Sequence, residues 1–351
     1  METEKSNITM KNDNIAAWSV VGQTEEILNR TQRDRRNDDM SGLSDVGQAE
    51  EILNRAQRDN RNNSDIIEEL AQRLLDDLFK DNKSLTGNGD EFHNFAVSIS
   101  KVIGENRASL EIVKKGLDIH PNDTDLLADG ILYGRNCGDT ELCMDYYKRL
   151  MLIDKSRWTW RAFSFSIDYL IDGPAPEDGD SPSFNDILTL VKDYQRYLPD
   201  KEDAWSSEFD LYREYNRRSE GKRALLEADK KLNYCPQCWL KLADYEHEDG
   251  NYEDALKYTR KIRKRPSSSV HVNMAYVFFL EGQCKYEELM DKNELYFEGT
   301  VEEDDVLKVY QLFRLAMTST GLRREYKDQI NALIDRIETE TDVIYPPEWS
   351  R

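Results

Sequence analysis

From residue 64 onward, apolar residues recur every three or four positions, which is the spacing of one face of an α-helix. Runs of helix length alternate with short turn sequences such as HPND, NCGD and EDGN. No clear strand pattern interrupts them. The pattern predicts an all-α body whose first helix carries Ile66, Leu70 and Leu74 on its apolar face.

Residues 1–63 differ, because they contain Asn, Asp, Arg and Ser runs with few large apolar side chains. Two stretches within them, VGQTEEILNRTQRDRRN (21–37) and VGQAEEILNRAQRDNRN (46–62), are identical at 14 of 17 positions. Each has a narrow apolar stripe and an Arg-rich end, and a helix this short is marginal alone in water. We expect a flexible, largely disordered segment in which each copy of the motif orders only on docking. The motif residues expected to make contacts are Ile27, Leu28, Arg30, Arg33, Ile52, Leu53, Arg55 and Arg58.

The body shows an internal period. Trp205 and Trp239 are 34 residues apart, and the next such step reaches Asn273. Trp160 lies 45 residues before Trp205, but an acidic, Pro- and Gly-rich insertion of 11 residues (173–183) accounts for the excess over 34. A period of 34 is typical of helix-turn-helix repeats that bury their apolar faces by stacking on one another.

Residues 238–266, CWLKLADYEHEDGNYEDALKYTRKIRKRP, resemble a tetratricopeptide repeat, with Trp239 in the first helix, Gly250 at the turn and Ala255 in the second helix. The segment that follows His120 resembles a second unit in which Leu127 takes the place of the Trp. The remaining units are degenerate. Asn216, for example, replaces the turn glycine. The resemblance implies a right-handed α-solenoid over residues 64–295, followed by capping helices and a tail over 296–351.

The net charge of the chain limits the classes of molecule that it can bind. Forty-eight basic and 69 acidic residues give a net charge of −21, so a phosphate backbone would be repelled, which excludes DNA and makes RNA an unfavourable partner. The sequence carries no signal peptide and no apolar run of membrane-spanning length, and we expect a cytoplasmic protein without membrane contact. Its five cysteines are too few for a disulfide framework.

Catalytic motifs are missing from the sequence: it has no phosphate-binding glycine loop, nucleophile elbow or HExxH. We therefore predict a protein without enzymatic activity or cofactor. The tetrapeptide CPQC (235–238) raises an alternative from another class, a redox or zinc site formed by Cys235 and Cys238. It lies between two helical repeats rather than at a strand-to-helix turn, which favours a structural role. Among the four histidines, His271 is the one plausible further zinc ligand.

The tetratricopeptide resemblance also implies a binding groove, lined by the first helices at the positions five and eight residues after each Trp. Four of the eight side chains at these positions are acidic, which predicts a groove for a basic helix or peptide. Basic residues gather instead at 257–265, where a solvated helix face and RNA binding are the alternatives. The candidate groove residues are Trp158, Arg161, Phe165, Asp168, Tyr169, Asp210, Arg213, Asp244, His247, His271, Phe278 and Glu281.

Three hypotheses concern the duplicated motif. One or both copies dock on the groove in cis and screen it until a partner displaces them, both are displayed outward as bivalent ligands, or the duplication has no function. The function that we expect is protein binding, as an adaptor, scaffold or regulatory subunit. A peptide-responsive regulator of a partner protein is the alternative. Neither the partner's identity nor the oligomeric state follows from the sequence.

Overall fold

The computed structural model describes residues 44–59, 64–80, 85–104, 106–172, 182–264, 272–291, 303–341 and 345–346. Regular structure within these ranges is entirely helical, as the apolar spacing predicts. The chain divides into two compact units, Met1–Tyr197 and Leu198–Arg351. No helix in the described ranges is both long enough and apolar enough to cross a membrane.

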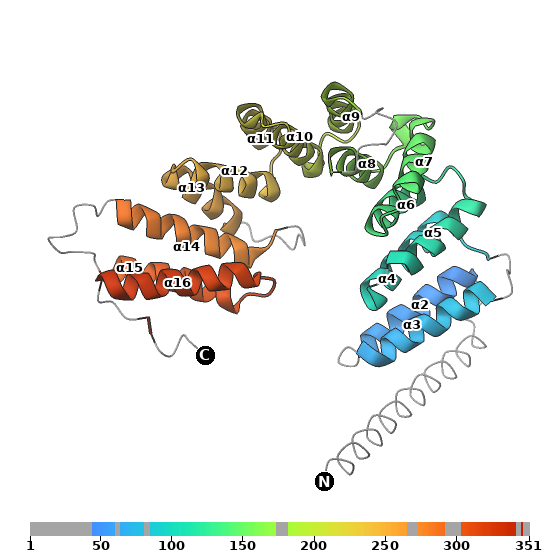
Figure 1. The fold of residues 1–351 in the computed structure, drawn as a ribbon, viewed down its shortest axis with the longest axis horizontal. Helices are drawn as coiled ribbons and strands as arrows, with labels where there is room; N and C mark the ends of the chain where they lie inside the picture. Colours follow the sequence, from blue (N-terminus) through green and yellow to red (C-terminus); the bar gives the residue numbers. More distant parts are fainter. Residues whose placement is uncertain are drawn as a thin grey trace, which may run out of the picture. The chain divides into compact units, whose positions relative to one another are not determined.

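The first unit consists of paired helices (Figure 1). Helices α4 and α5, α6 and α7, and α8 and α9 pack as pairs, and the first helices α4, α6 and α8 contact one another in sequence. Their bounds are α2 Asp45–Asp59, α3 Ser64–Phe79, α4 Gly89–Ile103, α5 Asn106–Ile119, α6 Thr124–Asn136, α7 Thr140–Met151, α8 Trp160–Asp172 and α9 Phe184–Tyr197, with a short 3-10 helix at Lys155–Arg157.

The second unit repeats this arrangement with the pairs α10 and α11, α12 and α13, and α14 and α15, followed by α16. Their bounds are α10 Glu202–Glu214, α11 Arg218–Lys231, α12 Pro236–Glu248, α13 Tyr252–Arg263, α14 Met274–Asp291, α15 Glu303–Thr318 and α16 Arg324–Thr341. Because α14 pairs with α15 as α12 pairs with α13, the boundary expected at residue 295 falls between the two helices of one pair.

Local sequence signals explain where these helices begin and end. Asn88 and Glu91 form a reciprocal capping box at the start of α4, and Asp123 caps α6 by accepting hydrogen bonds from two backbone N–H groups. Gly250 turns the chain between α12 and α13 at φ 76°. Asn216 holds the corresponding turn at φ 56°, which Asn tolerates better than most residues, so this replacement of the glycine preserves the turn.

The spacing of the repeats varies more than the sequence period indicates. The fourth residue of each first helix is buried, and these residues are Phe92, Leu127, Phe163, Trp205, Trp239 and Val277. Trp160 and Asn273 therefore do not occupy the position of Trp239. Trp160 is the first residue of α8, and Asn273 precedes α14, where its side chain accepts a hydrogen bond from Ala275 N. The cause is loop length: α14 begins 38 residues after α12, whereas α12 begins 34 residues after α10.

The second copy of the duplicated motif differs most from expectation. It forms α2, which packs on α3 and α4 with Val46, Ala49, Ile52, Leu53 and Ala56 buried. Residues 45–59 thus belong to the first unit and are not part of a flexible segment. The short apolar stripe is sufficient because two other helices cover it. The first copy, residues 21–37, lies outside the described residues.

Candidate functional site

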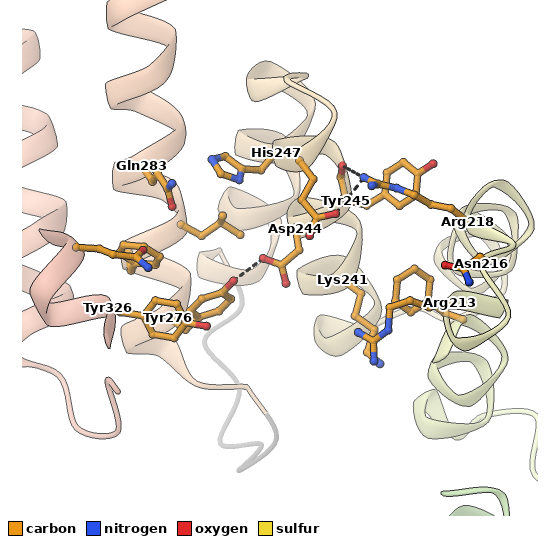
Figure 2. A pocket seen from close by; sticks show the side chains of 16 residues that line it. Arg213, Asn216, Arg218, Lys241, Asp244, Tyr245, His247, Tyr276, Gln283 and Tyr326 are labelled. Carbon is orange, nitrogen blue, oxygen red and sulfur yellow. Dashed lines mark hydrogen bonds and ion pairs between the residues drawn. The ribbon is translucent and has the colours of Figure 1, made fainter. Parts of the chain in front are cut away.

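A pocket of about 640 Å³ opens in the second unit, between the first helices of its pairs and α16 (Figure 2). Helices α10, α12 and α14 contribute most of its walls, as the tetratricopeptide resemblance implies for a groove. Its lining includes Phe209, Arg213, Arg218, Lys241, Asp244, Tyr245, His247, Glu248, Tyr276, Phe279, Leu280, Gln283 and Tyr326.

Asp244 is the distinctive group of this pocket. Its Oδ1 accepts a hydrogen bond from the Tyr276 hydroxyl at 2.8 Å, and no cation pairs with it among the described residues (Figure 2). Burial raises the pKa of this carboxyl to about 6, because the protein shields the charged form from water. Burial also lowers the pKa of His247, one helical turn further along α12, so this imidazole is mostly neutral at pH 7.

Carboxylates of the same unit balance the three cations of the pocket. Lys241 Nζ lies 2.5 Å from Asp210 Oδ2, and Arg213 lies 3.3 Å from Asp210 Oδ1. Arg218 pairs with Glu248 at 3.0 Å and with Asp249 at 2.9 Å. Asp244 is consequently the carboxylate of the pocket that a positive charge from outside would complement.

Aromatic rings line the same pocket as this carboxylate. The rings of Tyr276 and Tyr326 lie 4.9 Å apart between centroids, and Phe279 packs against Tyr326 at the same distance. Tyr245 already holds two cations over its ring, the guanidinium of Arg218 at 4.4 Å and the ammonium of Lys222 at 4.6 Å. A carboxylate among electron-rich rings suits a Lys or Arg side chain, which gains both a charge-assisted hydrogen bond and cation–π contacts.

The groove residues expected in this unit are only partly brought together. Arg213, Asp244 and His247 line the pocket, and Asp210 supports it through Lys241 and Arg213. Phe278 and Glu281 do not line it, because α14 presents Tyr276, Phe279, Leu280 and Gln283 there. Glu281 is instead buried, with both carboxylate oxygens 2.8 Å from Arg263 Nη1, and the Arg263 guanidinium also lies over Phe278. His271 lies outside the described residues.

In the first unit the predicted groove residues serve mainly to hold helices together. Trp158 is buried and donates from Nε1 to Ile153 O, and the Tyr169 hydroxyl contacts Thr140 O at 3.4 Å. Arg161 lies 3.8 Å from Asp125 and covers the Trp160 ring, against whose edge Phe165 packs. Asp168 is exposed.

The basic cluster at 257–265 has structural partners. Lys261 pairs with Asp229 and covers the Trp239 ring at 4.5 Å, and Arg263 pairs with the buried Glu281. Lys257 lies 3.8 Å from Asp254. These contacts occupy three of the cluster's charges and weaken the argument for RNA binding through it.

Cys235 and Cys238 are both buried at the junction between α11 and α12, the position expected for a structural role. A hydrogen bond with Cys235, together with burial, raises the pKa of the Cys238 thiol well above its ordinary value. A thiol that resists ionisation is a poor nucleophile and a poor metal ligand. No three His, Cys, Asp or Glu side chains in the described ranges are arranged to hold a metal ion.

Sequence reasoning missed the tyrosines of the pocket. Tyr326 lies in α16, beyond the last unit that the 34-residue step reaches, so the period gives no signal for it. Tyr276 is missed because it directly precedes Val277, the buried fourth residue of α14, whereas the resemblance places the groove residues five and eight residues after that position. The hydroxyl-to-carboxylate contact between Tyr276 and Asp244 joins residues 32 apart in sequence, one on each of two neighbouring first helices.

No known protein family and no curated protein matches the chain significantly. Among solved structures, a tetratricopeptide repeat protein from Parabacteroides merdae is similar at 14% identity and a TM-score of 0.43, over 77% of this chain and all of that one. The tetratricopeptide protein TTC0263 from Thermus thermophilus gives 16% identity and 0.42, over 57% and 98%. The human IFIT1 dimer with m7Gppp-AAAA gives 12% identity and 0.46, over 92% and 70%. The helix pairs of the two units themselves, with first helices in sequential contact, are of the tetratricopeptide-like helical repeat class.

Proposed function

We propose that this chain is a non-enzymatic protein-binding module whose second unit accepts a basic side chain of a partner peptide or helix in the pocket at Asp244. The observation that carries the proposal is a largely buried carboxylate in a pocket with tyrosine rings, for which Tyr276 is the one hydrogen-bond partner among the described residues. An incoming guanidinium or ammonium would replace the missing counter-ion. The ionised form of Asp244 would then be stabilised where burial now disfavours it.

The ligand comes from a partner protein in this proposal, and not from the second copy of the chain's own motif. The second copy of the motif contributes its apolar face to the packing of α2 on α3 and α4, so it is not available as a ligand for the pocket. The partner segment is basic, because Asp210, Glu248 and Asp249 balance the cations of the pocket, whereas no described cation forms an ion pair with Asp244. Adaptor, scaffold and regulatory roles all use such a site.

The test is a titration of the full chain with a panel of helical 12-residue peptides that differ at one position, which is Arg, Lys, citrulline or Glu. Arg and Lys peptides should bind and the citrulline peptide should bind weakly, because citrulline keeps the shape of Arg without its charge. Asp244→Asn should weaken binding of the Arg peptide on the order of tenfold to a hundredfold, the cost of a lost charge-assisted hydrogen bond.

Glu253→Gln is the matched control. It removes an exposed carboxylate from the first turn of α13, which neither lines the pocket nor belongs to the ion pairs of Lys241, Arg213 and Arg218. This variant should bind the Arg peptide as the unchanged chain does. Equal losses in the two variants, or equal affinity for Arg and citrulline peptides, would contradict the proposed role of Asp244.

A further inference from the structure

The surface that α2 covers in the first unit shows what the duplicated motif binds. We define this α2-binding surface as the faces of α3 and α4 that contact α2, together with the preceding residues 85–88 (Figure 1). Val46, Ala49, Ile52, Leu53 and Ala56 of α2 are at most 3% exposed on it. The second copy of the motif is therefore a helix docked on the α2-binding surface. Each of its contact residues can be compared with the corresponding residue of the first copy.

Polar contacts fix the start of α2 on this surface. Ser44 donates from Oγ to Glu91 Oε2 at 2.8 Å, and Gly47 N donates to Ser44 Oγ at 3.0 Å. Gly47 is required to be small, because a Cβ there would lie 2.4 Å from Glu91 Oε1. Asp45 accepts hydrogen bonds from Thr86 N and Thr86 Oγ1.

The first copy retains most of these contact residues. At the same offset of 25, Ser19 corresponds to Ser44 and Gly22 to Gly47, so the serine and the glycine that meet Glu91 are both present. The main apolar contacts are also unchanged. Val21, Ile27 and Leu28 correspond to Val46, Ile52 and Leu53.

Three differences at the contact face all favour the second copy. Val20 replaces Asp45 and cannot accept the hydrogen bonds from Thr86. Thr24 and Thr31 replace Ala49 and Ala56, and each adds a methyl carbon and a hydroxyl oxygen at a position that is fully buried in α2. Overpacking of this kind weakens docking on the order of tenfold or more. The first copy is thus the weaker of two ligands for one surface.

We propose that the α2-binding surface is exchangeable, and that residues 19–37 of the same chain take the place of α2 on it when α2 is displaced or disabled. The structure shows the preferred occupant. Covalent linkage gives both copies a high effective concentration at the surface. The connection to α3 favours α2 as well, on the order of tenfold, because four residues separate Asp59 from Ser64 whereas 29 separate the equivalent Asp34 from it.

The fit of the first copy is tested first by placing its residues in α2. The variant Asp45→Val with Ala49→Thr and Ala56→Thr should keep the first unit folded, with backbone amides of α2 exchanging hydrogen on the order of tenfold faster or more. Loss of the fold of the first unit in this variant would overturn the proposal, because it would show that residues of the first copy do not fit the surface.

Exchange itself is followed by hydrogen exchange and mass spectrometry on the full chain, in which the two copies give distinguishable peptides. The unchanged chain should protect residues 46–59 and leave 21–34 unprotected. Leu53→Asp, which places a charge at a fully buried position, should move protection to 21–34. Leu28→Asp should change nothing. The double variant should protect neither segment and expose the amides of α4 on the order of a hundredfold more than Leu53→Asp does.

Two results would overturn the proposal. If Leu53→Asp leaves 21–34 unprotected and behaves as the double variant does, including by unfolding the first unit, the first copy does not replace α2. If the protection of 21–34 rises with protein concentration, a second copy of the chain supplies the helix, and exchange within one chain is wrong.

Discussion

Replacing Arg263 with Ala is expected to cost the second unit about 3 kcal/mol of its free energy of unfolding, the lower end of the range for breaking a buried ion pair from one side, because the Glu281 carboxylate is buried whereas the Arg263 side chain is 37% exposed. Glu281 is 2% exposed, and both its oxygens lie 2.8 Å from Arg263 Nη1. Without Arg263 its carboxylate stays buried and loses its cation. Hydrogen exchange of the amides in α14, measured on the full chain, reports the loss.

Arg260→Ala provides the matched comparison. Arg260 lies one turn earlier on α13 with its side chain in solvent, and removing it should change the stability by less than about 0.5 kcal/mol. Adding Glu281→Leu to Arg263→Ala should recover most of the loss, since an apolar side chain needs no cation. A loss at Arg260 as large as that at Arg263 would mean that the cluster at 257–265 acts through its total charge, and not through this ion pair.

Trp239→Ala is the second large effect, about 3–5 kcal/mol of destabilisation for the second unit. The indole of Trp239 donates from Nε1 to Asp229 at 2.5 Å, packs edge-on against Tyr234 at 5.4 Å and carries Lys261 over its ring. Its removal leaves a cavity between α11, α12 and α13. Chemical unfolding of the full chain, followed by hydrogen exchange in α12, measures the cost.

Trp160→Ala is the informative counterpart, because the sequence period gives the two tryptophans the same place in the repeat. In the structure Trp160 is half-buried at the first position of α8, and Phe163 takes the buried fourth position. We expect Trp160→Ala to destabilise the first unit by only about 1 kcal/mol, whereas Phe163→Ala costs about 3–5 kcal/mol. The reverse order would show that the 34-residue step, and not the helix bounds, gives the correct register.

The class of fold was predictable because helical spacing and turn residues are local signals. Leu127, Trp205 and Trp239 were placed correctly from the sequence, and Asn216 was identified as the substitute for a turn glycine. The register beyond α12 was not predictable, because it depends on the length of the loop before α14. The 34-residue step therefore chose Phe278 and Glu281 for the groove, whereas α14 presents other residues to the pocket.

Charge was harder to interpret than spacing. Four acidic groove positions predicted an acidic surface, but Asp210 is neutralised by Lys241 and Arg213, and Glu281 by Arg263. These partners lie on neighbouring helices or one turn away, and sequence does not show which charges meet. Of the predicted acidic groove residues, Asp244 is the one that lines the pocket as a carboxylate available to a basic ligand. The amphipathic motif was likewise recognised as a docking helix, but its partner surface on α3 and α4 required the structure.

The most direct test of the proposed function measures how many protons are released when the peptide binds. If a basic side chain pairs with Asp244, whose pKa burial raises to about 6, binding must favour its ionised form and expel the proton that half of the molecules carry at pH 6. Affinity should rise from pH 5 to pH 7 for the same reason, and loss of charge on any protonated His247 acts in the same direction.

The measurement is calorimetric titration of the full chain with the Arg peptide at pH 6, in two buffers of different ionisation enthalpy. We predict release of about half a proton or more per peptide bound, and a clearly smaller release with Asp244→Asn, in which only protonated His247 contributes. Equal proton release in the variant, or none in the unchanged chain, would contradict the assignment of Asp244 as the partner of the basic side chain.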